Sequence, residues 1–568
     1  MLPNNTGMLQ PLASTPAAPS VVLCTLNAKY IHASLGLRYL LANMGPLRAC
    51  TVLCEFTIAR RTHEIADELL LALGAPAGAG VQVIGFGVYI WNVAQTCALV
   101  RLLKQLRPEL KLVLGGPEVS HELEGQEIVA LADHVVTGWG DISFPRLCQS
   151  LLYGPQPLMK VIAGEQPPLA QINLPYAEYT AADLAHRVVY VEASRGCPFK
   201  CEFCLSSLDK TAWAFDLDRL LDALAALHAR GARNFKFVDR TFNLKIDASL
   251  RILQFFLDRL PAQASAGGAP GLFAHFEVIP DHLPGRLKEM IARFPAGVLQ
   301  FEVGIQTFNV DVQRRIARKQ DNDKTVENLR WLVRTSHAHL HADLIFGLPG
   351  ESLQSFALGF DRLYALRPHE IQLGMLKRLR GTPIARHSAA HGMVFDPAPP
   401  YTVRETAAVS ASDVQRFTRL ARYWDLLANS GRFKRSLVLL LEPRDLPLQQ
   451  PPAGRPCEAH SGWSAFDRLL QLSDWLWAAT GSTSRLTPEM LVDQLFTYLR
   501  DQGGIPPGDC RQALLDDYLD SGARARPSVL RDVLPARTAP VRRPPAALPR
   551  QQRHRNDRAA RPQAPASA

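Results

Sequence analysis

Short apolar runs alternate with amphipathic stretches over residues 20–155. VVLCTL and KLVLGG have the length and composition of buried strands, whereas EIADELLLAL has apolar residues at the spacing of a helix. Such alternation is typical of a parallel sheet covered by helices on both faces. The pattern predicts a doubly wound, Rossmann-like α/β domain in this region.

Three glycines follow predicted strands of this first domain. In doubly wound sheets, ligands bind beyond the carboxyl ends of the strands. Gly115, Gly116 and Gly138 lie at such ends, so we take them as candidate cofactor-binding residues. The alternative is that each glycine only ends a strand, as glycine often does.

A second alternating region covers residues 187–390. Helical stretches such as LDRLLDALAALHAR separate its apolar runs. Six strand–helix units predict a partial (β/α) barrel. The six predicted strands are VVYVEAS, NFKFVD, FAHFEVI, LQFEVGI, LHADLIFGL and EIQLGML.

The remaining segments differ in composition from these two α/β regions. Residues 156–186 are rich in proline and predict a linker. Residues 391–534 have mainly helical patterns and predict a helical accessory domain. Residues 1–19 read as a flexible leader, and the Arg/Pro-rich residues 535–568 read as a disordered tail.

The net charge of +10 is concentrated at one end of the chain. Residues 535–568 contribute +7, which leaves +3 for the rest. A body so nearly balanced gives no compositional reason for a phosphate-binding face, so we expect no nucleic-acid partner.

Three features bear on the compartment. No apolar run reaches the ~18–20 residues that span a bilayer. The first twenty residues lack the basic and apolar regions of a secretory signal, and ten cysteines in 568 residues are too sparse for a disulfide framework. We therefore expect a soluble, cytoplasmic protein without a membrane partner.

The segment SRGCPFKCEFCLSS brings three cysteines onto one loop directly after a predicted strand. Cys197, Cys201 and Cys204 have the spacing Cys-x3-Cys-x2-Cys, with Phe203 before the last. Iron–sulfur clusters are held by cysteine thiolates, usually four. Three ligands leave one iron open, where the amino and carboxylate groups of S-adenosylmethionine (SAM) could chelate. A structural zinc site is the alternative, but it needs a fourth ligand, and none follows nearby.

This cysteine motif and the segments around it resemble radical SAM proteins with an N-terminal cobalamin-binding domain, and more narrowly the subgroup with a C-terminal domain of unknown function. The resemblance implies a [4Fe–4S] cluster, SAM and cobalamin as cofactors. It also implies a small-molecule substrate and an electron donor such as flavodoxin or ferredoxin. The segments that carry it, over residues 25–384, are TLNAKYIHASLGLRYL, YVEASRGCPFKCEFCLSSLDK, FKFVDRTFN, FEVGIQTFN, DLIFGLPGE and IQLGMLKRLRGTPI.

Within that resemblance, FVDRTFN corresponds to the strand end that contacts the methionine amino group. Asp239 and Arg240 are the candidates there, although the family's usual Gly-Gly-Glu is absent, and a structural Asp–Arg pair is the alternative. FEVGIQTFN places Glu302 and Gln306 where the ribose hydroxyls are bound. Strand alternation puts these two side chains on one face.

DLIFGLPGE corresponds to the strand that packs near adenine in this family. Ile345, Gly347 and Glu351 are its candidate cofactor-binding residues, together with Phe203 from the cysteine motif. GTPI (381–384) corresponds to a further family loop near the site. In both segments an ordinary turn is the alternative.

The cobalamin assignment depends on the N-terminal domain. The Asp-x-His-x-x-Gly loop of many cobalamin-binding domains is absent, and His32 lies on the corresponding loop at a different spacing. A domain of this fold without cofactor is the alternative. Cys50 and Cys54 raise an auxiliary cluster as another alternative, although apolar surroundings favour buried structural cysteines.

The predicted function is radical chemistry. SAM is cleaved reductively at the cluster to methionine and a 5′-deoxyadenosyl radical, which abstracts hydrogen from the substrate. With cobalamin as methyl donor, the leading prediction is C-methylation. A cobalamin-assisted cyclisation or rearrangement and a non-catalytic sensor are the alternatives.

Overall fold

The computed structural model describes residues 19–75, 80–260, 271–442, 463–523 and 525–534. The chain divides into two units. The first holds residues 1–190 and 218–232, and the second holds residues 191–217 and 233–568. The predicted tail and nearly all of the predicted leader lie outside the described residues.

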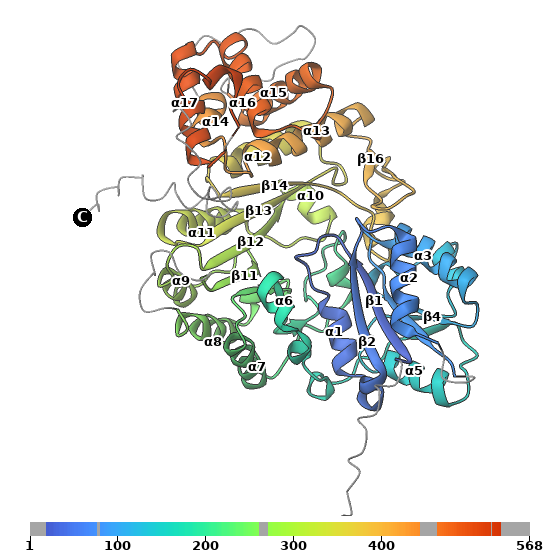
Figure 1. Ribbon diagram of the computed structural model, residues 1–568. Coiled ribbons are helices and arrows are strands. Elements are labelled where there is room, and N and C mark those ends of the chain that lie inside the picture. The colour runs from blue at the N-terminus through green and yellow to red at the C-terminus, as the bar shows by residue number, and fades with distance from the viewer. Residues whose placement is uncertain (1–18, 76–79, 261–270, 443–462, 524, 535–568) are drawn as a thin grey trace, which may run out of the picture. The chain divides into compact units, whose positions relative to one another are not determined.

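The first unit contains a six-stranded sheet in the order β2-β1-β3-β4-β5-β6, with every neighbouring pair parallel (Figure 1). The strands are β1 (Val21–Asn27), β2 (Thr51–Thr57), β3 (Val83–Gly87), β4 (Lys111–Gly115), β5 (His134–Thr137) and β6 (Val161–Ala163). The helices are α1 (Leu35–Ala42), α2 (Thr62–Leu73), α3 (Val93–Leu106), α4 (Glu127–Leu131), α5 (Ser143–Tyr153), α6 (Ala181–His186) and, apart from its first residue, α7 (Leu217–Ala229).

Apolar side chains fill both faces of this sheet. All seven residues of β1 are buried, and alternate residues contribute to two separate apolar clusters. Helices α2 and α3 pack in one cluster, whereas α1 and α5 pack in the other. The predicted doubly wound domain is therefore confirmed. Because chain order reverses between β1 and β3, their carboxyl ends form its topological switch point.

The segment predicted as a linker contributes to this unit. Val161–Ala163 forms β6, the strand at one edge of the sheet. Farther along, Thr180 caps the start of α6 in a capping box. The Thr180 side chain accepts a hydrogen bond from the Asp183 N–H, and the Asp183 side chain accepts one from the Thr180 N–H. Residues 156–186 are thus partly built into the first unit.

The second sheet runs in chain order, β14-β13-β12-β11-β10-β7, and its strands from β10 to β14 pair in parallel, as expected of a (β/α) partial barrel. Its two edge strands are not paired with each other within the described residues. Its strands are β7 (Val189–Val191), β10 (Asn234–Phe237), β11 (Phe273–Val278), β12 (Leu299–Gln306), β13 (His339–Phe346) and β14 (Glu370–Met375). Its helices are α8 (Ile246–Leu257), α9 (Gly285–Ala292), α10 (Val310–Arg315), α11 (Asn322–Thr335) and α12 (Leu353–Tyr364).

Burial alternates along the central strands of this sheet. In β13, for example, buried and half-buried residues alternate from Leu340 to Phe346. One face is aromatic: Phe237, Phe276 and Phe301 are almost fully buried. The other face presents polar side chains. The short pairs β8 (Ser194–Arg195) with β9 (Trp213–Ala214) and β15 (Val394–Phe395) with β16 (Val403–Glu405) are antiparallel.

The C-terminal part of the second unit is helical, as predicted (Figure 1). Helix α13 also covers the edge of β14: the Asn429 amide accepts a hydrogen bond from the Ile371 N–H and donates one to its carbonyl, and Trp424 donates a second bond to that carbonyl. This protects an otherwise open strand edge. The helices are α13 (Ala411–Leu427), α14 (Lys434–Leu441), α15 (Ala465–Thr480), α16 (Pro488–Asp501) and α17 (Pro507–Asp520).

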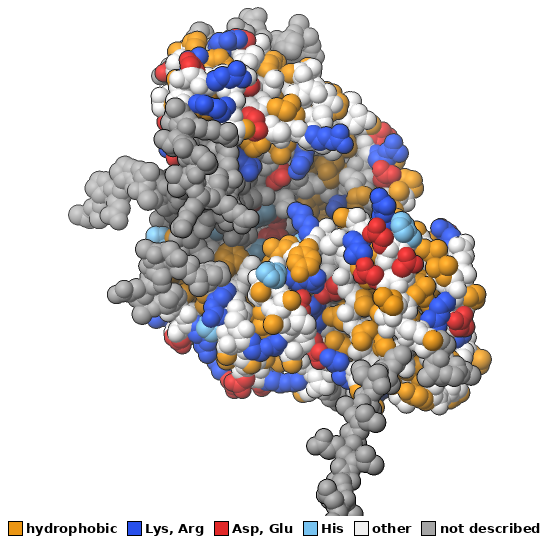
Figure 2. All heavy atoms as spheres, viewed as in Figure 1, with side chains coloured by type: hydrophobic (Ala, Val, Ile, Leu, Met, Phe, Trp, Pro, Cys, Tyr) orange, Lys and Arg blue, Asp and Glu red, His pale blue; other side chains and the backbone are white. Residues whose placement is uncertain are grey.

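No helix in the described ranges has the length and apolar character needed to cross a membrane. On the face shown in Figure 2, lysine and arginine side chains are interspersed with acidic, apolar and uncharged ones. This face therefore presents a mixed-charge surface.

Candidate functional site

The three motif cysteines lie on a compact loop between β8 and β9. Gly196 has φ +84°, and a Cβ there would lie 2.8 Å from the Asp209 carbonyl oxygen, so only glycine fits. The next residue, Cys197, donates its N–H to that same carbonyl at 2.8 Å. The loop is thus closed at its base immediately before the first cysteine.

The second half of the loop is held by Ser207. Its hydroxyl lies 2.8 Å from the Cys201 carbonyl and 2.7 Å from the Cys204 carbonyl, and Cys204 donates its N–H to the Cys201 carbonyl at 3.2 Å. These contacts fix the backbone of two cysteines in one turn. Cys197 and Cys201 are buried and Cys204 is half-buried, all three as free thiols.

The thiols face two guanidinium groups. Arg318 Nη1 lies 3.7 Å from Cys201 Sγ, and the charge of Arg240 acts on Cys197. Burial raises the pKa of both the Cys197 and Cys201 thiols, and these positive charges act in the opposite direction. Positive charges beside these thiols would stabilise them as thiolates and would favour a bound group with a net negative charge.

The three motif cysteines are not placed to ligate one zinc ion together. Zinc–sulfur bonds of ~2.3 Å hold the sulfurs within about 4 Å of one another. Among the described residues, no group of three or more His, Cys, Asp or Glu is placed to ligate a single ion. A four-iron cluster is larger and spreads its thiolates farther apart, so the loop fits a cluster better than zinc.

A polar network lies on the inner face of the second sheet. Glu302 Oε2 lies 3.2 Å from Lys236 Nζ and 3.1 Å from His275 Nε2. Burial would raise the pKa of Glu302, but the hydrogen bond from His275 and the charge of Lys236 outweigh it and lower that pKa. Glu302 is therefore a carboxylate already engaged by two side chains.

The network continues on β13 and β14. The ring of His341 lies 3.2 Å from Asp343 Oδ1 and 3.3 Å from Glu370 Oε2, and its Nε2 lies 3.0 Å from Gln372 Oε1. Burial opposes protonation, but the two carboxylates raise the pKa of His341 to about 10. The inner face thus pairs positive with negative side chains over five adjacent strands.

Asp239 and Arg240 do not pair with each other. Asp239 is buried and accepts hydrogen bonds from the Ala193 N–H and the Ser194 hydroxyl, and burial raises its pKa to about 6. Arg240 instead contacts both carboxylate oxygens of Glu277, at 2.7 and 2.9 Å. Of the two candidates, Arg240 is the one directed toward the cysteine loop.

Gln306, at the carboxyl end of β12, has an unusual backbone and an unsatisfied side chain. Its φ is +68°, a left-handed conformation that is rare outside glycine and that clusters at functional sites. Its Oε1 is buried without a hydrogen-bond partner. A polar ligand could satisfy that oxygen.

The candidates Phe203, Ile345 and Glu351 divide into two apolar side chains and a buried acid. Phe203 and Ile345 pack against one apolar cluster, which also holds Ile384 of the GTPI segment. Glu351 is 3 % exposed and accepts a hydrogen bond from Thr307, while its Oε2 has no partner. Burial raises the pKa of Glu351 to about 7.

Gly347, also after β13, has φ +87° and would bring a Cβ within 2.6 Å of Val403 Cγ1. The close packing of this turn explains why a glycine stands at position 347, and no cofactor contact is needed to explain it.

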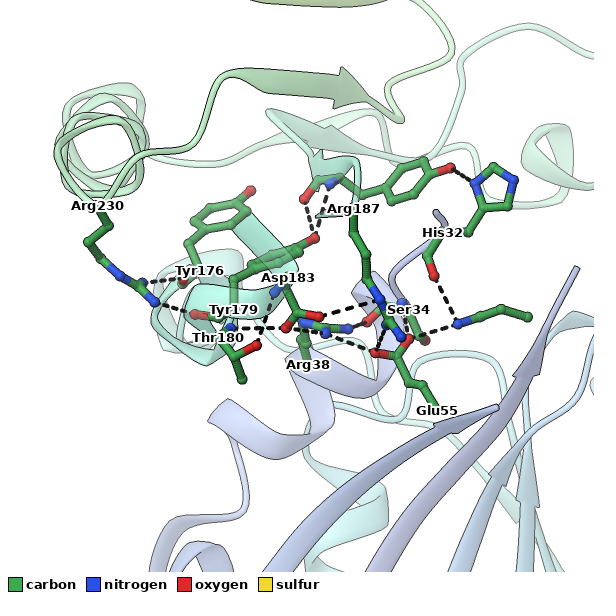
Figure 3. Close-up of polar contacts among 12 residues, drawn as sticks. His32, Ser34, Arg38, Glu55, Tyr176, Tyr179, Thr180, Asp183, Arg187 and Arg230 are labelled. Atoms are coloured by element: carbon green, nitrogen blue, oxygen red, sulfur yellow. Dashed lines mark hydrogen bonds and ion pairs between the residues drawn. The ribbon is translucent and has the colours of Figure 1, made fainter. Parts of the chain in front are cut away.

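In the first unit, an ion-pair network lies above the carboxyl ends of β1 and β2 (Figure 3). Arg38 Nη2 lies 2.8 Å from Glu55 and 2.9 Å from Asp183, and Arg187 Nη1 lies 2.7 Å from Glu55. All four side chains are at most 11 % exposed. Two arginines and two carboxylates balance, so this network anchors α6 and the segment after it to the first sheet.

His32 belongs to the same surroundings (Figure 3). Its Nδ1 lies 2.7 Å from the hydroxyl of Tyr190, and its carbonyl accepts a hydrogen bond from Asn27. One ring nitrogen is therefore held by a tyrosine, which fixes the orientation of this ring.

The switch point of the first sheet presents aromatic and apolar side chains. Tyr30 and Ile31 follow β1 and are 55 % and 44 % exposed, and Trp91 follows β3 and is 48 % exposed. The Trp91 ring stacks on Tyr89 with centroids 4.5 Å apart, and its Nε1 donates to the Leu26 carbonyl. Exposed rings at a ligand-binding edge fit a large flat cofactor.

The three candidate glycines lie at the same edge. At Gly116, with φ +107°, a Cβ would lie 2.5 Å from the Val88 carbonyl oxygen, so close backbone packing requires this glycine. A Cβ at Gly115 would make an ordinary contact, and one at Gly138 would meet nothing within 4 Å. Gly138 therefore leaves open space at the edge.

A cavity of about 360 Å³ lies elsewhere in the second unit. Helix α13 forms one wall, and His341 and Gln372 of the polar inner face form part of the other. The lining residues are His341, Gln372, Leu373, Ala421, Arg422, Asp425 and Asn429, and none of them belongs to the cysteine loop.

Comparison with known proteins agrees with this geometry. Residues 191–358, which contain the cysteine loop and most of the second sheet, match the radical SAM superfamily. These residues therefore form a radical SAM domain. Residues 389–449 match a family described as a protein of unknown function, DUF4080. The family assignment confirms the predicted [4Fe–4S] cluster and SAM as cofactors.

Two relatives are similar to this chain over part of its length. An uncharacterized methyltransferase of Pyrococcus horikoshii is 31% identical over 207 residues, which are 31% of this chain and 44% of that protein. The cobalamin-dependent radical SAM methyltransferase TokK of Streptomyces tokunonensis is 24% identical over 331 residues, 52% of this chain and 47% of TokK. The chain spans less than half the length of these curated relatives.

A solved structure shows the fold over a longer stretch. The cobalamin-dependent radical SAM enzyme OxsB with aqua-cobalamin bound matches with a TM-score of 0.57 at 13% identity, covering 91% of this chain and 80% of OxsB. This likeness supports the predicted fold class, with a doubly wound first unit and a radical SAM second unit.

Several residues around the cysteine loop were not predicted from the sequence. Glu277, the partner of Arg240, and Arg318, beside Cys201, are the most direct of these. Strand alternation could have placed Glu277 on the inner face. Nothing local marks Arg318, which follows a short helix and reaches back to the Gly304 carbonyl.

Proposed function

We propose that this radical SAM protein is a cobalamin-dependent C-methyltransferase that acts on a small molecule. One observation carries the proposal: the chain combines a radical SAM cysteine loop with a doubly wound unit whose switch point presents exposed aromatic rings. Relatives named as methyltransferases and the likeness to a cobalamin-binding structure support the same reading.

Cys197, Cys201 and Cys204 would hold the cluster in the second unit. When bound, the cluster supplies the electron that cleaves SAM to methionine and a 5′-deoxyadenosyl radical. Arg318 lies beside Cys201 and would pair with the SAM carboxylate, which carries a negative charge. Arg240 and Glu277, held together by two hydrogen bonds, would face the methionine end as one unit.

The other predicted residues would hold the adenosine part of SAM. Gln306 offers an unsatisfied amide oxygen, which would accept a hydrogen bond from a ribose hydroxyl. Glu302 would lie nearby on the same strand, kept ionised by Lys236 and His275. Ile345 would contact the adenine ring. Glu351 would stabilise the segment after β12 by accepting a hydrogen bond from Thr307.

Tyr30, Ile31 and Trp91 would hold the cobalamin in the first unit. When bound, this cofactor supplies the methyl group that is transferred. The exposed rings and aliphatic side chain offer a surface for the apolar parts of a corrin, and Gly138 leaves room beside them. His32, held by Tyr190 and outside an Asp-x-His-x-x-Gly pattern, would support this edge rather than ligate the metal.

The substrate and the electron donor are further parts of the proposal. A small molecule would be the substrate, and a flavodoxin or ferredoxin would deliver the electron. The paired charges on the inner face of the second sheet favour a polar substrate, because an apolar one would not replace the water that solvates them.

Label transfer tests the methyltransferase proposal. The anaerobically reconstituted protein is incubated with hydroxocobalamin, a reductant and SAM that carries a deuterated methyl group. The mass of the extracted corrinoid is then measured by mass spectrometry. The proposal predicts a deuterated methyl group on the corrinoid and S-adenosylhomocysteine as co-product. Bound but unlabelled corrinoid together with SAM cleavage would favour a cyclisation or rearrangement instead.

A pair of variants locates the corrinoid. Trp91→Ala removes an exposed ring at the switch point and is expected to lower the amount of corrinoid that co-elutes with the protein. Leu71→Ala removes a side chain that is 82 % exposed on α2, away from the strand ends, and is expected to leave it unchanged. Equal retention in both variants would contradict the proposed position.

A further inference from the structure

Glu202 lies inside the cysteine motif and has no role in the chemistry described so far. It stands between Cys201 and Phe203, and it is only 3 % exposed. A buried carboxylate is costly unless it is paired and hydrogen-bonded. Its partners therefore indicate what this residue does.

Both of its side-chain oxygens are engaged by the short 3-10 helix Pro383–His387, which follows β14. His387 Nε2 lies 2.7 Å from Glu202 Oε2, and Arg386 Nη2 contacts Oε1. The His387 side chain is 15 % exposed, so this contact is largely shielded from water. A hydrogen bond shielded from water is electrostatically stronger than an exposed one.

The backbone of Glu202 makes two more long-range contacts. Its N–H donates to the Ile316 carbonyl at 3.0 Å, and its carbonyl accepts from the Ile384 N–H at 3.0 Å. Ile316 directly follows α10, the helix after β12, and Ile384 belongs to the GTPI segment. One residue thus connects the cysteine loop to the segments after two different strands.

These two segments flank the proposed SAM site. Gln306 ends the strand that leads to α10, and Arg318, two residues beyond Ile316, contacts Cys201. Phe203 and Ile384 pack in one apolar cluster with Ile345. Any movement of Glu202 relative to these segments would change the distance between the cysteines and the groups proposed to hold SAM.

We propose that Glu202, held by Arg386 and His387, is a positioning residue that sets the cluster loop relative to the SAM-binding residues. The inference rests on the cluster and SAM part of the proposed function and is independent of cobalamin. Glu202 ligates nothing itself and acts through the loop that carries the ligands.

Electron paramagnetic resonance of the reduced cluster, titrated with SAM, tests this role. The variants are Glu202→Gln, His387→Gln and the double variant, each with its iron content measured. Asp311→Asn is the matched control, because it removes a carboxylate from an exposed pair with Arg314 on α10. The readout is the SAM concentration that gives half of the spectral change.

Glu202→Gln keeps the three cysteines and is expected to retain about four irons, but to need about tenfold more SAM, the usual size of an effect from a residue that supports metal ligands. His387→Gln is expected to shift the midpoint in the same direction by less. The double variant is expected to match Glu202→Gln, because residues that act through one contact are not additive.

A Glu202→Gln midpoint equal to wild type, an equal shift in Asp311→Asn, or additive effects in the double variant would each overturn the inference. If Glu202→Gln does not retain iron, His387→Gln decides: full iron with an unchanged midpoint overturns it. A wild-type protein whose spectrum does not respond to SAM would instead contradict the proposed SAM site.

Discussion

The two parallel sheets of this protein use their strands differently. In the first sheet, β1 and β3 are buried at every position, and helices cover both faces. In the second sheet, β12 and β13 alternate between buried aromatic or aliphatic residues and half-buried polar ones. The first sheet is thus a closed core, whereas the second has one face of paired charges.

This difference decides where chemistry can take place. A sheet covered on both faces can offer a ligand only the loops at its strand ends, which is where Tyr30 and Trp91 are exposed. A sheet with one polar face can offer side chains from within its strands, such as Glu302 and His341. The first unit is therefore suited to hold a cofactor at its edge, and the second to surround a reacting molecule.

The largest expected effect separates a cysteine of the motif loop in the second unit from a cysteine of the first sheet. Cys201→Ala removes a proposed cluster ligand and is expected to abolish nearly all bound iron. Cys24→Ala, in β1 of the first sheet, removes a fully buried thiol and is expected to keep the iron of wild type. Iron and sulfide are quantified after anaerobic reconstitution. Loss of iron in the Cys24 variant would instead support an auxiliary cluster in the first unit.

The next effect concerns the ion pairs above the first sheet. Arg38→Met leaves Glu55 and Asp183 with one arginine and is expected to lower the free energy of unfolding of this unit by about 3–5 kcal/mol. Arg48→Met breaks an exposed pair with Glu178 and should cost less than about 1 kcal/mol. Hydrogen exchange of the β1 amides measures both. Similar losses would mean that the buried network adds no more stability than a surface pair.

Substitution of two glycines at the carboxyl edge of the first sheet is expected to lower the free energy of unfolding by a smaller amount. Gly116→Ala forces a strained backbone and a contact with the Val88 carbonyl, and is expected to cost about 3 kcal/mol. Gly138→Ala has open space around it, so only its φ of +68° opposes it, and about 1 kcal/mol is expected. The same exchange measurement compares them. A Gly138 variant as unstable as the Gly116 variant would show that space at this edge is not decisive.

The smallest effect is a pH dependence in the second unit. Burial raises the pKa of Glu351 to about 7 in the folded protein, above its ordinary value, so folding favours the protonated acid. Stability from this group is present at low pH and is lost as the pH rises toward and through about 7. Between pH 6 and 8 the loss should be about 1.4 kcal/mol, the equivalent of one pKa unit.

Glu351→Gln, which cannot ionise, should remove this pH-dependent loss. Urea unfolding of the anaerobic holoprotein at the two pH values measures it. An unchanged pH dependence in the variant would place the titration elsewhere.

The sequence predicted the fold well because both sheets depend on local patterns. Continuous apolar runs such as VVLCTL identified strands buried on both faces, and the cysteine spacing marked the loop that holds the three motif cysteines. Strand β6 was missed because Val161–Ala163 is only three residues long and lies among prolines.

The charge pairs of the site were beyond local patterns. Arg240 meets Glu277 and not the adjacent Asp239, and His341 meets Glu370 across a strand register. Arg318 reaches Cys201 over 117 residues of chain. Such contacts depend on which strands become neighbours and in what register, and neither periodicity nor spacing encodes that.

The most direct test of the central claim is the cleavage of SAM. The reconstituted, reduced protein is incubated anaerobically with SAM, and 5′-deoxyadenosine and methionine are quantified for wild type and Cys201→Ala. The account predicts that wild type forms both products in equal amounts and that the variant forms neither. A wild-type protein that holds a full complement of iron and leaves SAM intact would contradict it.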